Sequence, residues 1–195
     1  MTGLLGGAFD PPHDGHVALV REAERRFALE RVVVLVVADP GHKDVELDAP
    51  TRLELARAAF PGYDVELDRH ARTVDMLREG RFADPLFLIG ADEFCDFLSW
   101  KEPGAVLELA RLGVATRPGF PRGRLDRVLA ELERPDRVEL FEIEPVAASS
   151  SEIRARVARG EPIAGLVPEE VADLIRRFGL YRPAGYTSHG SAQGD

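Results

Sequence analysis

Apolar positions recur along the chain with two alternating spacings. Bounded apolar runs favour buried strands, and such runs occupy residues 4–9, 31–38, 63–67, 86–89, 112–115 and 138–143. Apolar residues that return every three or four positions are typical of helices, and they do so at residues 16–29, 51–60, 74–78, 103–110 and 125–132. Two further helices are predicted at the C-terminal end, one beginning near residue 149 or 150 and one at residue 168.

This alternation predicts an α/β fold. Strands buried on both faces, each followed by a helix, build a mostly parallel, Rossmann-like sheet with helices on both faces. We expect a single domain over residues 1–182 that ends in the C-terminal helices, and a disordered tail over the small, polar residues 183–195. Ligands in such sheets bind at the carboxyl ends of the strands, so the loop after the first strand is the first candidate site.

Composition narrows the classes of protein to consider. Hydrophobic residues make up 45% and charged residues 30% of the 195 residues, as in ordinary globular proteins. The net charge of −9 argues against a nucleic-acid partner, because proteins that bind a phosphate backbone carry basic faces. No apolar run is long enough to cross a membrane, and no signal peptide is expected. The single Cys95 cannot form an internal disulfide, which favours a cytoplasmic protein.

The loop after the first predicted strand reads Gly-Gly-Ala-Phe-Asp-Pro-Pro-His-Asp-Gly-His and begins at Gly6. Its glycines let backbone approach a ligand, and the helix that starts here offers free N–H groups to phosphate. His13 and His16 can donate hydrogen bonds to phosphate oxygens without burying permanent charges. The alternative is a Gly/Pro turn with incidental histidines. A metal site on the histidines is disfavoured, because their spacing is not i, i+4 and no cysteine or acidic set completes it.

A second anion site is predicted where Ser-Ser-Ser-Glu-Ile-Arg begins at Ser149. Ser149 and Glu152 have capping-box spacing, which predicts a helix N-terminus. Its free N–H groups suit an anion, as do the hydroxyls of Ser150 and Ser151 and the guanidinium of Arg154 one turn into the helix. Taken alone, the segment fits a plain capping box with a surface arginine better than an anion site, because capping boxes are routine helix starts.

The loop that begins at Gly7 resembles the G-x-F-D-P-x-H-x-G-H signature of the HxGH nucleotidyltransferase superfamily, and the serine segment is similar to its I-S-S-T-x-I-R motif. The resemblance implies a Rossmann-like sheet in which His13 and His16 hold the phosphates of ATP. It also implies that Ser150 and Arg154 contact the β- and γ-phosphates. Further ATP contacts implied by the resemblance are Gly7, Ala8, Phe9, Gly15, Gly90, Asp92 and Ser151.

Other segments resemble the bacterial nicotinate-mononucleotide adenylyltransferases of this superfamily. Pro-Gly-His-Lys, ending at Lys43, is similar to their P-P-H-K loop, and Lys43 would bring positive charge to the phosphates. Ile-Gly-Ala-Asp, ending at Asp92, resembles their I-G-x-D, with the carboxylate on ribose hydroxyls or serving as a helix N-cap. The mononucleotide contacts implied are Thr73, Trp100, as a stacking partner of the pyridine ring, and Arg117. Lys43 as a solvated lysine and Trp100 as core filler are the alternatives.

One segment departs from the family pattern. Members carry a tyrosine before a threonine in a segment like S-Y-T-x-x-T-L, where this chain reads Ala-Arg-Thr-Val-Asp-Met-Leu over residues 71–77. Thr73 remains, but Arg72 replaces the tyrosine and Met76 the second threonine. The preference for nicotinate or nicotinamide stays open, since Arg72 either favours the acid through its charge or points to solvent.

The reaction implied is the transfer of AMP from ATP to nicotinate mononucleotide, giving nicotinate adenine dinucleotide and pyrophosphate in NAD biosynthesis. The attacking phosphate is already an anion, so catalysis rests on positioning and on charge from His13, His16, Lys43 and Arg154. Mg²⁺ is expected as the cofactor, carried by the ATP phosphates rather than by a dedicated protein site. The alternatives are nicotinamide mononucleotide or another phosphorylated acceptor, and a non-catalytic nucleotide-binding module. A homo-oligomer also stays open.

Overall fold

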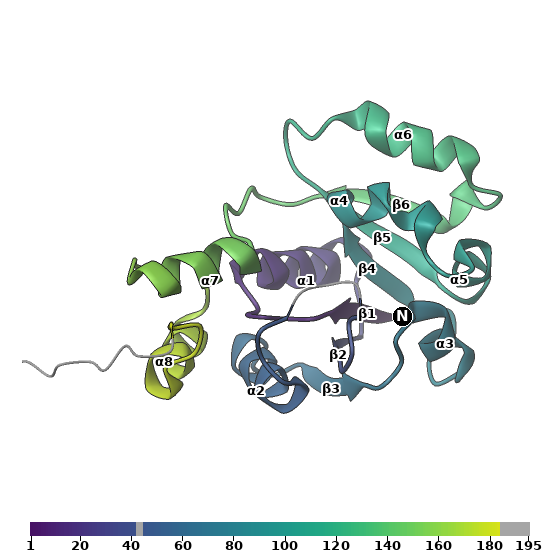
Figure 1. Cartoon of the computed structure of the whole chain (residues 1–195). Coiled ribbons are helices and arrows are strands. Elements are labelled where there is room, and N and C mark those ends of the chain that lie inside the picture. The colour runs from purple at the N-terminus through teal and green to yellow at the C-terminus, as the bar shows by residue number, and fades with distance from the viewer. Residues whose placement is uncertain (42–44, 184–195) are drawn as a thin grey trace, which may run out of the picture.

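The computed structural model describes residues 1–41 and 45–183. Within them one six-stranded sheet has the order β3-β2-β1-β4-β5-β6 (Figure 1). Every neighbouring pair of strands is parallel, which confirms the predicted α/β fold. The order switches direction between β1 and β4. The strands are β1 (Thr2–Gly7), β2 (Arg31–Val37), β3 (Asp64–Asp68), β4 (Leu86–Gly90), β5 (Arg111–Thr116) and β6 (Val138–Glu142).

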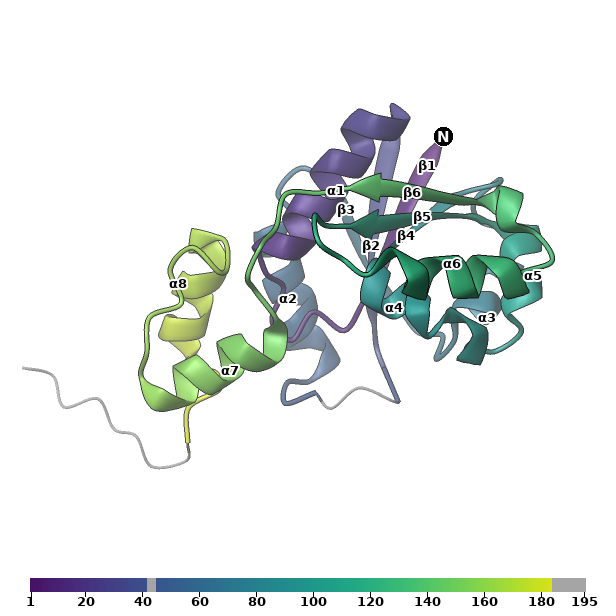
Figure 2. The same cartoon turned by 90° about the horizontal axis from the view of Figure 1, so that it is seen from above.

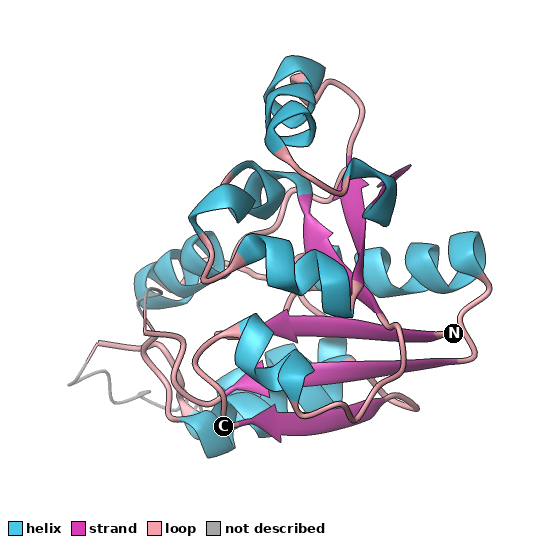
Figure 3. Cartoon of the chain, turned by 90° about the vertical axis from the view of Figure 1, so that its right-hand side faces the viewer, coloured by secondary structure: helices cyan, strands magenta, loops and turns pink. Residues whose placement is uncertain are grey.

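Helices cover both faces of this sheet, as Figure 3 shows. Short 3-10 turns, η1 (Phe97–Ser99) and η2 (Pro135–Arg137), join them. None of the helices in the described residues has the length and apolar character needed to span a membrane. The helices are α1 (Asp14–Phe27), α2 (Ala49–Ala59), α3 (Thr73–Arg78), α4 (Ala91–Cys95), α5 (Pro103–Leu109), α6 (Arg122–Glu131), α7 (Ser150–Arg159) and α8 (Glu169–Phe178).

Two apolar cores form because side chains alternate across each strand. Val34 of β2 belongs to the core that contains side chains of α1, α2, α7 and α8, whereas Leu35 belongs to the other core, with side chains of α3 to α6. Figure 2 separates the two groups, with α7 and α8 at one end of the molecule and α3, α5 and α6 at the other. The middle of β2 is buried on both faces, as its continuous apolar run predicts.

The boundaries of the strand and the helix on either side of the first motif differ from the predicted ones. β1 stops at Gly7 instead of continuing to Phe9, because Phe9 adopts a left-handed φ of 53° that a strand cannot contain. α1 begins at Asp14, ahead of the predicted start at His16. The short α4 and the turn η1 had no helical prediction, because so few residues cannot display a helical period. Of the predicted tail, all but Pro183 lies outside the described residues.

Candidate active site

Two adjoining cavities lie at the carboxyl ends of β1 and β4, where the strand order switches. The histidine cavity, of about 350 Å³, is lined by both His13 and His16. The tryptophan cavity, of about 550 Å³, is lined by Trp100. Five residues line both cavities, namely Gly6, Gly7, Ala8, Asp92 and Glu93. A ligand with two linked halves could therefore occupy both cavities at once, with the linker between its halves over the end of β1.

Close packing explains why two glycines stand in the first motif. A Cβ on Gly7 would lie 2.9 Å from the ring of Phe9, and one on Gly15 would lie 3.0 Å from Nδ1 of His13. The Phe9 ring is 2% exposed and meets His16 and Phe60 edge-on, at centroid distances of 5.1 and 5.8 Å. Phe9 thus lines the histidine cavity mainly as a support for the histidines, and its contact with ATP stays a prediction.

The histidines are stacked at the start of α1. Their ring centroids are 3.7 Å apart with an interplanar angle of 27°, and the backbone N–H of His13 donates to Nδ1 of His16 over 3.2 Å. Burial lowers the pKa of His13 to about 4, so its ring is neutral at pH 7. Within the described residues Nδ1 of His13 is buried without a hydrogen-bond partner.

The second predicted segment packs directly against the first. Ser149 is the N-cap of α7 and accepts from the backbone N–H of Glu152 over 3.3 Å, which confirms the predicted helix start. The hydroxyl of Ser150 donates to the carbonyl of Pro11 over 2.8 Å, so this serine ties α7 to the motif loop and lines the histidine cavity. Ser151 is exposed and does not line it. Of the two predicted serine contacts, the structure therefore brings only Ser150 to the cavity.

Arg154 lines the histidine cavity but is already paired. Its Nη1 donates to the carbonyl of Asp10 over 2.8 Å, and its Nε lies 2.9 Å from a carboxylate oxygen of Glu46. The side chain is only 15% exposed. A triphosphate in this cavity would meet a guanidinium that Glu46 now neutralises.

A buried network of hydrogen bonds, which the sequence did not reveal, supports the loop of the first motif. The carboxylate of Asp10, 2% exposed, accepts from the Tyr181 hydroxyl over 2.7 Å and from the backbone N–H of Glu46 over 2.6 Å. Burial and the bond to Asp10 raise the pKa of Tyr181, so the phenol keeps its proton. Tyr181, which follows α8, thus links the C-terminal helices to the first motif.

Arg52 is the second support and is 1% exposed. Its Nε donates to the carbonyl of Leu47 over 3.0 Å, and its two Nη atoms donate to the carbonyls of Ala8, Val37 and Ala38, each over 2.8 Å. Burial lowers the pKa of Arg52, and the charge of Asp10 opposes that shift. One side chain therefore holds the motif loop, the end of β2 and the start of α2 together.

Asp92 lies on the border between the two cavities. Gly90, not Asp92, is the N-cap of α4, and Asp92 follows in its first turn. Its carboxylate forms ion pairs at 3.5 Å with Arg117 and Arg124, and both guanidinium groups lie over the ring of Phe120. Arg117 lines the histidine cavity and not the tryptophan cavity, so the structure does not place it with the other predicted mononucleotide contacts.

Trp100 and Thr73, the other two predicted mononucleotide contacts, come together in the tryptophan cavity. The half-buried indole meets Phe87 edge-on at 6.2 Å between centroids and lies 5.3 Å from the ring of Phe97. Trp100 therefore both packs in the core and borders the cavity. Predicted Lys43 lies outside the described residues. Among the residues that the structure does describe, no group of three or more His, Cys, Asp or Glu could hold a metal ion.

Comparison with known proteins gives one consistent result. The family model described as Cytidylyltransferase-like matches residues 4–156. A probable nicotinate-nucleotide adenylyltransferase of Moorella thermoacetica is 38% identical over 93% of this chain and 92% of its own. One of Thermus thermophilus is 40% identical over 92% of this chain and 98% of its own. The structure of the Plasmodium falciparum nicotinic acid mononucleotide adenylyltransferase complexed with NaAD shares the fold, with a TM-score of 0.74 at 18% identity over 92% of this chain and 96% of that chain. The chain belongs to the nicotinate-nucleotide adenylyltransferase family.

Proposed function

We propose that this protein transfers AMP from ATP to nicotinate mononucleotide, giving nicotinate adenine dinucleotide and pyrophosphate in NAD biosynthesis. The observation that carries the proposal is the pair of adjoining cavities, one lined by His13 and His16 and the other by Trp100. A dinucleotide has the same two-part shape. Its phosphates would lie over Gly7 and Ala8, which line both cavities.

The chemistry needs orientation and charge rather than a strong base. An oxygen of the mononucleotide 5′-phosphate attacks the α-phosphorus of ATP in line, the bond from that phosphorus to the bridging oxygen breaks, and pyrophosphate leaves. His13 and His16 would donate hydrogen bonds to the phosphate oxygens as charge moves onto the leaving group. Ser150 and Arg154, with Lys43 from its loop, would hold the β- and γ-phosphates.

Mg²⁺ is the cation that we propose for this reaction, where it would neutralise charge on the phosphates. The described residues supply no cluster of acidic or histidine ligands for it. Its ligands would then be phosphate oxygens and water, as is usual for this ion. The single Cys95 supports a reducing compartment, and we propose the cytoplasm.

The test is release of pyrophosphate from Mg·ATP with nicotinate mononucleotide, nicotinamide mononucleotide and phosphopantetheine in parallel. We expect release with a pyridine mononucleotide and none with phosphopantetheine. His16→Ala should lower turnover by a factor on the order of 10² while the far-UV spectrum stays unchanged. Arg21→Ala, an exposed change on the same helix, is the control. No release with any acceptor would overturn the function, and near-full activity of His16→Ala would overturn the role of that residue.

A further inference from the structure

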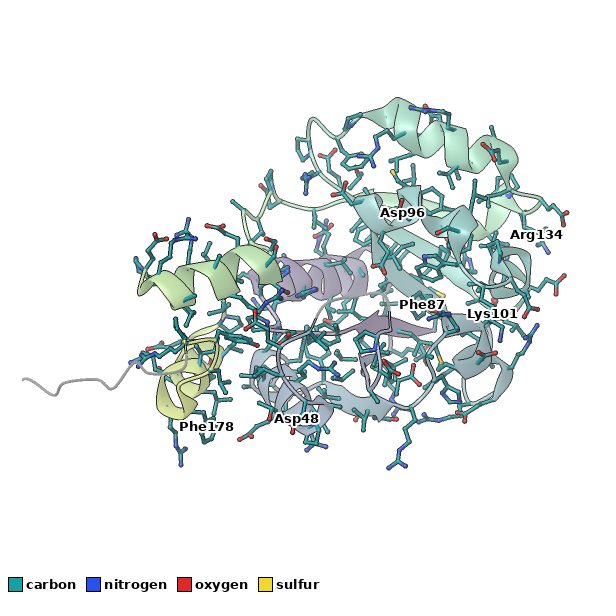
Figure 4. The ribbon with its side chains drawn as sticks, viewed as in Figure 1. Asp48, Phe87, Asp96, Lys101, Arg134 and Phe178 are labelled. Carbon is teal, nitrogen blue, oxygen red and sulfur yellow. The ribbon has the colours of Figure 1, made fainter. Side chains whose placement is uncertain are left out.

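The tryptophan cavity has charged walls that bear on which pyridine ring it accepts. Nicotinate carries a carboxylate on that ring where nicotinamide carries a neutral amide. An acid therefore needs a cation or strong donor in the cavity, and an amide does not. Figure 4 labels Phe87, Asp96 and Lys101, which lie around this cavity. Its lining includes four carboxylates, Asp68, Asp92, Glu93 and Asp96, and three basic side chains, His70, Arg72 and Lys101.

Two of the three basic side chains are already neutralised. The Nζ of Lys101 lies 2.9 and 3.1 Å from the two carboxylate oxygens of Asp75. Both ring nitrogens of His70 face carboxylates, Nδ1 at 2.7 Å from Asp68 and Nε2 at 3.1 Å from Glu79. A substrate carboxylate could engage either side chain only by displacing an existing partner.

Arg72 differs from both. Within residues 1–41 and 45–183 its guanidinium has no carboxylate partner, and its one hydrogen bond goes from Nη1 to the carbonyl of the adjacent Ala71 over 2.9 Å. It is the N-cap residue of α3. A Cβ built on Gly41 would lie 3.8 Å from its Nη1, so the side chain reaches across to the loop after β2. Among the described residues, Arg72 is therefore the basic side chain at the wall of the cavity whose charge no carboxylate pairs, and most of its N–H donors make no hydrogen bond there.

We propose that Arg72 determines the preference for the acid form of the acceptor by binding the ring carboxylate of nicotinate mononucleotide. This inference rests on the proposed function and adds a determinant to it. The planar guanidinium can donate two parallel hydrogen bonds to a carboxylate. The amide of nicotinamide offers a single oxygen acceptor and no charge, and its NH₂ group would face donors. The residue that departs from the family tyrosine thus supplies selectivity by charge.

The experiment compares kcat/KM for nicotinate mononucleotide with kcat/KM for nicotinamide mononucleotide in the wild type, Arg72→Gln and Arg72→Lys. We expect the acid-to-amide ratio to fall about tenfold or more in Arg72→Gln, because a hydrogen-bonded charge is lost. The ratio for Arg72→Lys should lie between those of the wild type and Arg72→Gln, because lysine keeps the charge and loses the planar guanidinium. Arg69→Gln, an exposed change in the same segment that does not line the cavity, should leave the ratio unchanged.

Both acceptors are measured on the same preparation, so any loss of folded enzyme cancels in the ratio. An unchanged ratio in Arg72→Gln would overturn the inference while leaving the proposed function in place. Wild-type enzyme that makes no dinucleotide from either acceptor would overturn the function itself. A fall in both kcat/KM values by the same factor would show that Arg72 only supports the loop after β2, and would also overturn the inference.

Discussion

Replacing Arg52 by methionine is the most direct test of how the site is held. The change keeps a long, unbranched side chain and removes the whole guanidinium. It leaves the carbonyls of Ala8, Val37, Ala38 and Leu47 without their donor. It also removes a cation beside the buried carboxylate of Asp10.

The size of the effect follows from these contacts. Each buried polar group left unpaired costs about 1–3 kcal/mol. Four unpaired carbonyls set an upper limit to this cost, and water that enters the space will reduce it. We therefore expect the free energy of unfolding to fall by about 3–5 kcal/mol, as it does when one partner is removed from a buried charged pair. With an m-value of about 2.5 kcal/mol per molar urea, the unfolding midpoint should fall by about 1.5 M.

The assay is urea unfolding followed by far-UV circular dichroism at low temperature. Arg57→Met is the matched control, because Arg57 is an exposed arginine on the same helix and should change the free energy of unfolding by less than about 0.5 kcal/mol. If Arg52→Met fails to fold, Arg52→Lys, which keeps the charge and some donors, should still lower the midpoint measurably. An Arg52→Met protein whose free energy of unfolding lies within about 1 kcal/mol of that of Arg57→Met would show that the four carbonyl contacts of Arg52 do not stabilise the fold to this extent.

Two further predictions concern the cavities. Burial lowers the pKa of His13 from an ordinary 6.5 to about 4, so its neutral ring stabilises the fold above pH 6.5 and this contribution is lost as pH falls toward 4. The free energy of unfolding of the wild type, relative to His13→Asn, should therefore shrink on acidification, and a constant difference would contradict the burial. Trp100→Ala should raise the apparent KM for the mononucleotide more than that for ATP, and equal effects would mean that the indole serves only to pack against Phe87 and Phe97.

The sheet could be predicted because its signal is local. The Val-rich run of β2 is buried on both faces, and a strand in that environment is apolar along its whole length. The two segments that border the histidine cavity could also be predicted. A glycine-rich turn with His13 and His16, and a serine cap before Arg154, each lie within a few consecutive residues. That both segments border one cavity could not be predicted, because it depends on contacts between them, such as the bonds from Ser150 to the Pro11 carbonyl and from Arg154 to the Asp10 carbonyl.

The supporting residues could not be predicted, because their roles depend on distant partners. Arg52 and Arg57 lie on one helix among similar neighbours, yet one is 1% exposed and the other faces solvent. Nothing in the helical pattern distinguishes them. Tyr181 and Asp10 are 171 positions apart and meet by a single hydrogen bond. A pattern read over a window of one helix has no access to such pairs.

The pairing of Arg154 bears on how an acidic chain would bind the triphosphate that we propose for this site. Arg154 is paired with Glu46, so no isolated positive charge has to be buried. A triphosphate bound as proposed would have to displace that carboxylate. The backbone of Glu46 is held separately, by its N–H bond to Asp10, and the guanidinium is held by the Asp10 carbonyl. The exchange can therefore be confined to one half-exposed glutamate side chain, while the buried network of Asp10, Tyr181 and Arg52 keeps the motif in place.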